Sequence, residues 1–348
     1  MIKLGIVGTG GIANWHAKNF QPMHGVEIVA CADLVKERAE DYAERFGVNA
    51  AYGDYEEMFD KEDLDAVSVT TTDSGHCPVS LAALKKNLHV FCEKPLADNL
   101  KDAKRMAAAA KRKKGLITGV NFSYRNNDGT QKAARMIASG KIGRVMHVEG
   151  SYLQAWLASQ HWGDWRTMPK WLWRLSTAHG SMGCLGDVGV HLFDLAGFVV
   201  GDIVEVDCLM KTFDKGKKKI GEYTLDANDG FAANVAFRNG AIGTLHSSRW
   251  ASGHVNTVAL RVFGDKGALD LNLDRGENPL MGCLGKDFDK VQWKPVRLAK
   301  KPSTFQRFIT AIRTGKQCQT SFEGGARVQA YLDACMRSNE DRKPVKIK

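Results

Sequence analysis

Glu93, Lys94 and Pro95 directly follow a β-like run that ends at Cys92. Pro95 has no backbone donor for a central sheet, and it disfavours α geometry at the residue before it, so the strand must end at this point. Open α/β sheets bind their ligands beyond the carboxyl ends of the strands. The sequence therefore places the amine of Lys94 where a ligand would be bound.

A second candidate pair is Asp187 and His191, four residues apart in the stretch GCLGDVGVHLFD. If this stretch is helical, the two side chains share a face, and the carboxylate can orient the imidazole and fix its tautomer. Such a pair can act as a general base near neutral pH. An exposed Asp/His pair without a role is the commoner explanation of this spacing alone. No compact His, Cys or Asp cluster stands nearby in the sequence to complete a zinc site, so no metal is expected.

The beginning of the chain has the pattern of a dinucleotide-binding loop. Gly8-x-Gly10-x-x-Ala13 follows a strand-like run and precedes a helix-like one. Glycines let the backbone turn tightly and approach a pyrophosphate, which then rests on the helix N-terminus. Asp33 ends the second strand-like run, where a carboxylate accepts hydrogen bonds from the ribose hydroxyls and repels a 2′-phosphate. We therefore expect NAD in preference to NADP.

Two further groups bear on the cofactor. Lys36 and Arg38 lie just beyond this acid and could neutralise a 2′-phosphate, which keeps NADP as the alternative. Thr71 and Thr72 end another strand-like run, and His76 lies at the start of the helix that follows. Hydroxyls at this place can contact the ribose or the carboxamide of the cofactor, or they can simply cap the helix.

Five of the eight tryptophans fall in one short segment that also contains Arg166 and Arg174. Aromatic faces bury the apolar C–H surface of a sugar ring, and guanidinium groups can bond its hydroxyls. A subunit interface or a core cluster explains any one of these tryptophans equally well. We expect one or two of them to reach a ligand; the five are Trp156, Trp162, Trp165, Trp171 and Trp173.

The pattern of strand-like and helix-like runs changes at about residue 122. Before it, short β-like runs without clean alternation are each followed by a helix-like run, which indicates a parallel sheet covered on both faces. After it, six strand-like segments and turns such as Asn239-Gly240 indicate an antiparallel sheet. The expected fold class is α/β, with a nucleotide-binding domain at 1–122 and an α+β domain at 123–348.

Composition narrows the class of protein. The net charge of +10 includes basic runs at 111–115 and 215–219, but neither is interleaved with aromatic residues, so we expect solvated faces and no nucleic-acid binding. No apolar run approaches the roughly 20 residues of a membrane span, and the chain opens on a strand pattern, so we expect a cytoplasmic protein without a membrane partner. The eight cysteines have no C-x-x-C spacing and are expected to be reduced and mostly buried.

Four stretches together resemble the Gfo/Idh/MocA family of oxidoreductases: GIVGTGGIAN, CEKP, NFSYR (121–125) and GCLGDVGVHLFD. The resemblance covers nearly the whole chain. It implies a Rossmann domain for NAD(P), then an α+β domain whose large open antiparallel sheet often forms the subunit interface, and hence a homodimer or homotetramer. In that family the lysine of the E-K-P motif and the Asp and His of the second motif form the catalytic set, which by position are Lys94, Asp187 and His191.

The resemblance also implies the reaction, which is hydride transfer between the nicotinamide and a secondary hydroxyl of a sugar, a sugar derivative or an inositol-like cyclic polyol. Lys94 would hold the reacting oxygen as a cation, His191 would take the hydroxyl proton, and Asp187 would orient the histidine or the substrate. Whether the lysine or the histidine is the final base stays open, because the two can titrate as a coupled pair.

The expected contacts follow from these motifs. Those to the cofactor are Gly8, Gly10, Gly11, Ile12, Asp33, Arg38, Thr71, Thr72, His76, Glu93, Lys94 and Asn121. Those to the substrate are Lys94, Arg125, Trp173, Arg174, Asp187 and His191.

Two alternative functions share this fold. One is an NAD-dependent glycosidase that oxidises its substrate only transiently, and the other is a non-enzymatic sugar-sensing regulator. A regulator has no need of Lys94, Asp187 and His191 together, so their joint presence counts against it.

Overall fold

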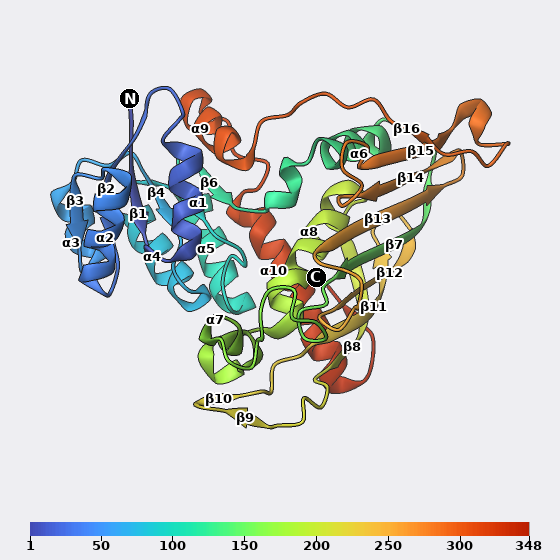
Figure 1. Cartoon of the computed structure of the whole chain (residues 1–348). Helices are drawn as coiled ribbons and strands as arrows, with labels where there is room; N and C mark the ends of the chain where they lie inside the picture. The colour runs from blue at the N-terminus through green and yellow to red at the C-terminus, as the bar shows by residue number, and fades with distance from the viewer. Residues whose placement is uncertain (348) are drawn as a thin grey trace. The chain divides into compact units, whose positions relative to one another are not determined.

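The computed structural model describes residues 1–347. The chain begins with a six-stranded parallel sheet whose strand order is β3-β2-β1-β4-β5-β6 (Figure 1). Its helices are α1 to α5, each following the strand of the same number. The order reverses between β1 and β4, which is the switch point at which doubly wound sheets bind ligands. The elements are β1 (Ile2–Val7), α1 (Gly11–Phe20), β2 (Val26–Ala32), α2 (Lys36–Phe46), β3 (Ala50–Tyr52), α3 (Tyr55–Lys61), β4 (Ala66–Val69), α4 (Asp73–Lys85), β5 (His89–Cys92), α5 (Leu100–Arg112) and β6 (Thr118–Val120).

The chain divides into two compact units, and the first also takes a segment from late in the sequence. The first unit comprises Met1–Ser123 and Pro302–Gln329, and the second comprises Tyr124–Lys301 and the residues from Ala330 onward. The sequence had predicted a single domain boundary, after residue 122. The late segment carries α9 (Thr304–Thr314) and the start of α10 (Phe322–Asp341). Rings of α9 complete the core of the first unit, since the Phe305 ring lies 5.0 Å from that of Phe20 on α1.

The second unit is built on a nine-stranded sheet with the order β16-β15-β14-β13-β7-β12-β11-β8-β17. All its pairs are antiparallel except β7 with β12. A parallel pair needs a long crossover connection, and α8 (Val190–Val199), β8 and β11 lie between these two strands in the sequence. The six predicted strands are β7, β8 and β11 to β14. The strands are β7 (Val145–Leu153), β8 (Ile203–Lys211), β11 (Gly230–Phe237), β12 (Ile242–Ser248), β13 (Thr257–Gly264), β14 (Gly267–Asn272), β15 (Leu280–Leu284), β16 (Lys294–Pro295) and β17 (Val345–Lys346).

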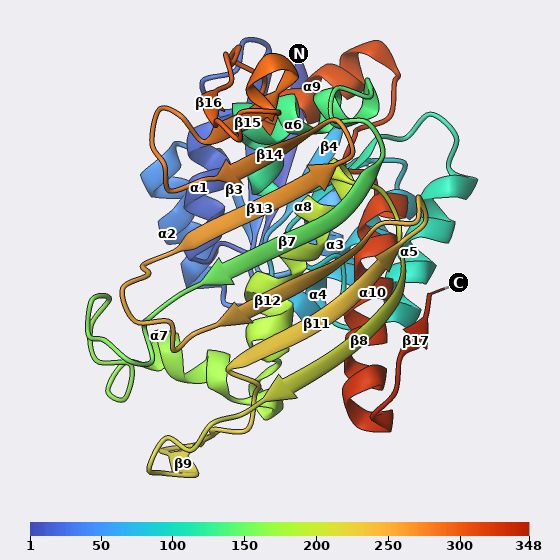
Figure 2. The same cartoon turned by 90° about the vertical axis from the view of Figure 1, so that its right-hand side faces the viewer.

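Helices cover one face of this sheet, and Figure 2 looks onto the other face. α8 (Val190–Val199) is apolar nearly all round and packs on β7 and β13, and α6 (Asp128–Ala138) packs on β14. The part of α10 in this unit is bonded to the sheet, since Ser338 Oγ accepts from the backbone nitrogen of Cys208 at 2.9 Å. The short elements are η1 (Ser123–Asn126), α7 (Pro169–Leu172), η2 (Trp173–Leu175), η3 (Thr177–His179), η4 (Leu185–Gly189), β9 (Lys219–Ile220), β10 (Tyr223–Thr224) and η5 (Gly285–Asp287).

Three observations bear on the expectations from composition. All eight cysteines are buried and unbridged, as predicted. Within residues 1–347, no helix is long and apolar enough to cross a membrane. The basic run at 215–219 is not wholly solvated, as had been expected: the side chain of Lys215 is 1% exposed and pairs at 2.5 Å with the buried carboxylate of Asp229. Asp229 lies 14 residues beyond Lys215 in the sequence, so the composition of the basic run alone did not indicate this buried ion pair.

Candidate active site

The loop between β1 and α1 has the backbone that a dinucleotide requires. Gly8 has a φ of +89°, and a Cβ there would lie 2.7 Å from the backbone nitrogen of Thr71, so only glycine fits. A Cβ at Gly10 or Gly11 would meet no described atom within 4 Å, which leaves room for a close approach by a pyrophosphate. Gly10 is the N-cap of α1 and has no side chain to bond the first amides, so the helix N-terminus can hold a phosphate. Ile12 is exposed in the first turn of that helix.

Asp33 follows β2 and turns its carboxylate toward this loop. Its Oδ2 accepts from the backbone nitrogen of Thr9 at 2.8 Å and from the Thr9 hydroxyl at 3.1 Å, and its Oδ1 accepts from the nitrogen of Val35 at 3.0 Å. A carboxylate held here can accept from ribose hydroxyls. Arg38 lies on the exposed side of the first turn of α2. The glycine cradle and the oriented carboxylate fit NAD.

Thr71, Thr72 and His76 lie between β4 and the first turn of α4. Thr72 is the N-cap of α4, but its hydroxyl makes no capping bond, so capping does not account for it. His76 is fully buried, and its Nδ1 donates to the carbonyl of Pro95 at 2.7 Å, because a carbonyl can only accept. Its Nε2 lies 3.3 Å from the carbonyl oxygen of Thr71. The imidazole therefore joins the threonine loop to the segment after β5.

Glu93 stands just beyond β5 in a buried polar network that joins four segments of the first unit. Its Oε1 accepts from Nε2 of His16 at 2.8 Å and from Nδ2 of Asn121 at 2.6 Å. On the far side of the ring, Nδ1 of His16 lies 2.6 Å from the hydroxyl of Ser68. Asn121 Oδ1 accepts from the hydroxyl of Thr304 at 2.9 Å. The network ties β4, the end of β5, the residue after β6 and the start of α9 to helix α1.

This network supports Lys94 through its neighbour. Burial raises the pKa of the Glu93 carboxyl, but the bonds from His16 and Asn121 outweigh it, and with the charge of Lys94 they lower that pKa to about 2. Glu93 Oε2 accepts from the backbone nitrogen of Lys94 at 3.1 Å. Lys94 itself is half-buried, and its peptide bond to Pro95 is cis. An ionised, fully bonded carboxylate thus fixes the backbone that carries the lysine.

In the second unit, Asp187 and His191 lie on one continuous helical run. Asp187 belongs to η4, a turn of π-helix that leads directly into α8, where His191 is the second residue. Residues four apart fall on nearly the same side of either helix type, so the predicted shared face stands. Single π-turns inside α-helices are frequent at functional sites.

The imidazole of His191 is nearly buried, with 9% of the residue exposed, and packs against two tyrosines. The Tyr124 ring stands edge-on to it at 4.8 Å between centroids, and the Tyr152 ring lies at 6.3 Å. The two phenol oxygens are 2.6 Å apart, and Tyr152 also donates to Oδ1 of Asn256 at 2.8 Å. Burial raises the pKa of Tyr124, so its phenol stays protonated at physiological pH.

Two arginines hold the carboxylate of Asp187. The side chain of Arg249, just beyond β12, is 0% exposed, and its Nη2 donates to Asp187 Oδ2 at 3.0 Å. Arg174 approaches the same oxygen with Nε at 3.6 Å. The prediction had Asp187 orienting His191 or the substrate, and the structure adds this pair of cations on its other side.

Arg125 has a buried carboxylate partner. It is 8% exposed, and its guanidinium bonds both oxygens of Asp194 on α8, with Nη2 2.5 Å from Oδ1 and Nε 2.9 Å from Oδ2. Burial raises the pKa of Asp194, and the charge of Arg125 opposes that rise. The Phe198 ring lies 4.4 Å from the guanidinium carbon. This ion pair fixes η1 on α8 in the second unit.

Most of the clustered tryptophans form a core. Trp156 and Trp165 are 3% and 2% exposed, and they pack with leucines in a separate apolar cluster. Trp171 is partly buried and stacks on Trp156 at 5.3 Å. Trp173 is 36% exposed, and the guanidinium of Arg174 lies 4.5 Å from its ring centre. Trp173 and Arg174 therefore keep the surface that a sugar would need.

Comparison with known proteins decides the family. The model described as "Oxidoreductase family, NAD-binding Rossmann fold" matches residues 2–122, and the "GFO/IDH/MocA C-terminal domain" model matches residues 130–270. A 1,5-anhydro-D-fructose reductase of Ensifer adhaerens is 31% identical over 71% of this chain and 69% of its own length. The chain belongs to the Gfo/Idh/MocA oxidoreductase family. The resemblance, the NAD cofactor and the α/β fold class predicted from the sequence are confirmed.

Two further relatives and one solved structure are similar to this Gfo/Idh/MocA oxidoreductase along most of its length. The myo-inositol 2-dehydrogenase of Thermotoga maritima is 27% identical over 99% of this chain and 98% of its own. The levoglucosan dehydrogenase of Pseudarthrobacter phenanthrenivorans is 27% identical over 85% of this chain and 80% of its own. A solved levoglucosan dehydrogenase in complex with NADH has a TM-score of 0.88 at 24% identity, covering 100% of this chain and 99% of that one, and this likeness shows the fold.

Several residues that support the motifs of this oxidoreductase were not singled out in the sequence. Arg249 lies at the end of the strand-like run at 241–250, and His16 lies in the helix-like run after the glycine loop, and neither residue belongs to a motif. A histidine in the helix after a glycine-rich loop is a weak signal of a buried polar network. Tyr124 lies inside the quoted NFSYR motif, whereas nothing in the spacing of Tyr152 distinguishes it from other strand residues.

Proposed function

We propose that this protein is an NAD-dependent dehydrogenase that transfers hydride between the nicotinamide and a secondary hydroxyl of a sugar, a sugar derivative or a cyclic polyol. The observation that carries the proposal is the presence of Lys94, Asp187 and His191 together. Each of them contacts a buried side chain of its own unit. A chain that only sensed a sugar would gain nothing from building all three supports.

The substrate class is supported by the names of the three relatives. They are a levoglucosan dehydrogenase, a myo-inositol 2-dehydrogenase and a 1,5-anhydro-D-fructose reductase. Levoglucosan, inositol and anhydrofructose are all compact rings that carry several hydroxyl or carbonyl groups and no charge. We expect a ring of this kind as the substrate, with the exposed Trp173 for its apolar face and Arg174 for its hydroxyls.

We further propose that Lys94, Asp187 and His191 act on one substrate. In the oxidation, His191 would take the hydroxyl proton. The glycine loop and Asp33 would hold NAD, whose nicotinamide would supply the acceptor for the hydride of the carbinol carbon. The ammonium of Lys94 hydrogen-bonds the substrate oxygen and stabilises the developing alkoxide. Asp187, held by Arg249 and approached by Arg174, orients the histidine or a substrate hydroxyl.

The test is the absorbance of reduced nicotinamide during incubation with NAD or NADP and a panel of neutral rings. The panel includes levoglucosan, myo-inositol, 1,5-anhydroglucitol and common hexoses, and the reverse reaction is followed with 1,5-anhydrofructose and NADH. We expect turnover with NAD on at least one ring alcohol. If no ring reacts in either direction while NAD raises the unfolding temperature, the dehydrogenase proposal is wrong. Release of an aglycone from a glycoside without net NADH would point to the transient-oxidation alternative.

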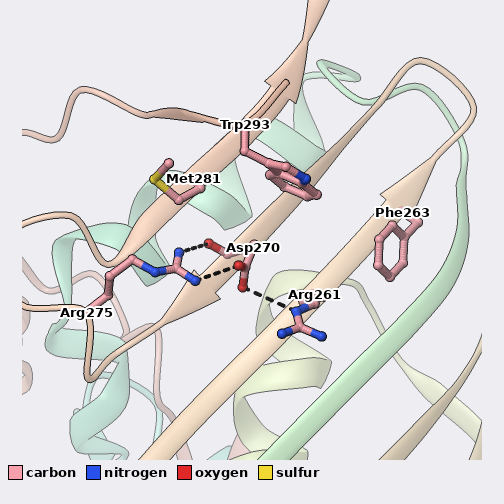
Figure 3. A pocket seen from close by; sticks show the side chains of 6 residues that line it. All are labelled: Arg261, Phe263, Asp270, Arg275, Met281 and Trp293. Atoms are coloured by element: carbon pink, nitrogen blue, oxygen red, sulfur yellow. Dashed lines mark hydrogen bonds and ion pairs between the residues drawn. The ribbon is translucent and has the colours of Figure 1, made fainter. Parts of the chain in front are cut away.

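The outer face of the nine-stranded sheet supports a homodimer or homotetramer. Ile242 on β12 and Leu209 on β8, with β11 between these two strands, are 60% and 57% exposed there. A hollow of about 540 Å³ lies on β13 to β15 of this unit. Figure 3 shows Asp270 in it, between Arg261 and Arg275 and next to apolar side chains. We propose that a second copy covers this face, since exposed apolar patches of this kind mark interaction sites. Eight unbridged cysteines support a reducing, cytoplasmic location.

A further inference from the structure

Arg249 is a buried charge that contacts Asp187 and takes no step of its own in the reaction described above. Its side chain is 0% exposed, and it follows directly after β12 in the second unit. We propose that Arg249 is a positioning residue that fixes the carboxylate of Asp187 for the reaction. The inference rests on the proposed function, because it concerns the same aspartate.

The guanidinium is held from several sides. Nη2 donates to Oδ2 of Asp187 at 3.0 Å, and Nη1 donates to the backbone carbonyl of Arg174 at 3.0 Å. The Trp156 ring covers the group, with its centre 5.1 Å from the guanidinium carbon. One donor holds the carboxylate and the other holds a backbone carbonyl, so the planar group fixes Asp187 relative to the backbone of Arg174, which a point charge could not do as tightly.

The backbone of Arg249 is fixed as well. Its nitrogen donates to the carbonyl of Asp229 at 2.9 Å, and its own carbonyl accepts from the nitrogen of Leu157 at 3.2 Å. Both ends of the side chain are thus anchored, so the guanidinium cannot follow Asp187 if the carboxylate turns. A buried charge is costly unless it is paired, and Asp187 is the acid that pairs with it.

The bonds of Arg249 also join two segments that the proposed function places at the substrate. One bond goes to Asp187 on η4, and the other goes to the backbone carbonyl of Arg174, which directly follows the exposed Trp173. The same guanidinium therefore sets the catalytic carboxylate and the segment that carries the aromatic surface for a sugar. Its loss should lower kcat through misplacement of Asp187 and leave the affinity for NAD unchanged, since the dinucleotide motifs are in the first unit.

The test compares Arg249→Lys and Arg249→Ala with Arg238→Ala as the matched control. Arg238 follows β11 in the same unit, and its exposed side chain pairs with Asp202 at 3.5 Å. Lysine keeps the charge but cannot make both bonds, so we expect kcat to fall about 10-fold in Arg249→Lys and about 100-fold in Arg249→Ala. The affinity for NAD stays at the wild-type value in all three, and the control keeps the wild-type kcat.

Two further readouts separate positioning from a merely structural role. Added guanidinium at low millimolar concentration restores part of the lost kcat in Arg249→Ala, whereas methylammonium does not. In a background of Asp187→Asn, the change Arg249→Lys costs less than about 3-fold, because the two residues act as a unit. An equal loss in both backgrounds, or a wild-type kcat in Arg249→Lys, overturns the inference. If Arg249→Ala does not fold, Arg249→Lys alone decides it, and a wild-type enzyme that is silent on the panel refutes the proposed function instead.

Discussion

At the scale of single residues, Lys94 carries the strongest prediction. Lys94→Ala is expected to lower kcat by roughly 100- to 1,000-fold, the usual loss when one donor to a developing oxyanion is removed. NAD binding, followed by quenching of protein fluorescence, is expected to stay unchanged. The matched control is Lys86→Ala, at an exposed lysine of the same unit that pairs with Asp60. A wild-type kcat in Lys94→Ala would contradict the proposed mechanism.

Asp33 decides the choice of cofactor. Asp33→Ser removes the charge that accepts from the ribose and repels a 2′-phosphate. Losing a hydrogen bond to a charged group costs about 1.5–3 kcal/mol, so kcat/KM for NAD should fall by roughly 10- to 100-fold. With NADP it should rise, aided by Lys36 and Arg38 nearby. Steady-state kinetics with both cofactors checks this, and an unchanged ratio would show that Asp33 serves only to bond Thr9.

At the scale of elements, the network around Glu93 joins four segments of the first unit to α1. The pKa of Glu93 is about 2, below its ordinary value of 4.5, so its ionised form stabilises the fold. This contribution, on the order of 3 kcal/mol, is complete above about pH 4.5 and is lost as the pH falls toward 2. The difference in unfolding free energy between wild type and Glu93→Gln should therefore shrink from pH 6 to pH 3. Urea titrations at each pH measure it, and a constant difference would contradict the assignment.

The loop between β1 and α1 separates folding from binding at two glycines. Gly8→Ala puts a Cβ 2.7 Å from backbone at a φ of +89°, so the unfolding temperature should drop by several degrees. Gly10→Ala meets no described atom within 4 Å and has an extended backbone, so its unfolding temperature should match the wild type. Its methyl group lies where the pyrophosphate would approach, so its affinity for NAD should fall. Calorimetry with and without NAD checks both, and the reverse ranking would contradict this account of the loop.

Most elements could be predicted from periodicity, and the reasons for the misses are physical. The strand-like runs at β1, β2, β4 and β7 carry two or three Val or Ile residues each, and those at β5 and β11 combine one valine with phenylalanine. β15 has the sequence LMGCL, which carries neither alternation nor a flanking Asn-Gly turn. The return of α9 to the first unit was invisible, because Phe305 and Phe308 give the helix an apolar face without indicating which sheet it covers.

The candidate site was predictable only where a motif carries it. Lys94 and His191 stand in recognisable motifs, and Asp33 has its place after the second strand. Arg249 and His16 do not, because their roles depend on contacts across 62 and 77 residues of sequence. The core role of Trp156 and Trp165 could not be separated from a ligand role before their burial was known.

At the scale of the whole molecule, the open sheet predicts assembly. Ile242→Asp puts a charge on the outer sheet face at the start of β12, so it should convert the dimer or tetramer to a smaller species. Phe213→Asp, an exposed apolar residue outside the sheet strands, is the control and should leave the assembly intact. Light scattering coupled to size-exclusion chromatography gives the mass. A wild-type protein that runs as a monomer at micromolar concentration would refute the proposed interface.

In the proposed reaction, hydride passes from a ring carbon to NAD under the control of Lys94, Asp187 and His191. This step is tested most directly by transfer of label: perdeuterated myo-inositol and levoglucosan are incubated with NAD, and the nicotinamide is analysed by mass spectrometry. We expect reduced nicotinamide that carries one deuterium and accumulates in step with the ring ketone, and an initial rate of labelling at least about 100-fold lower in Lys94→Ala. Product without deuterium in the nicotinamide, or an equal rate of labelling with Lys94→Ala, would contradict the proposed reaction.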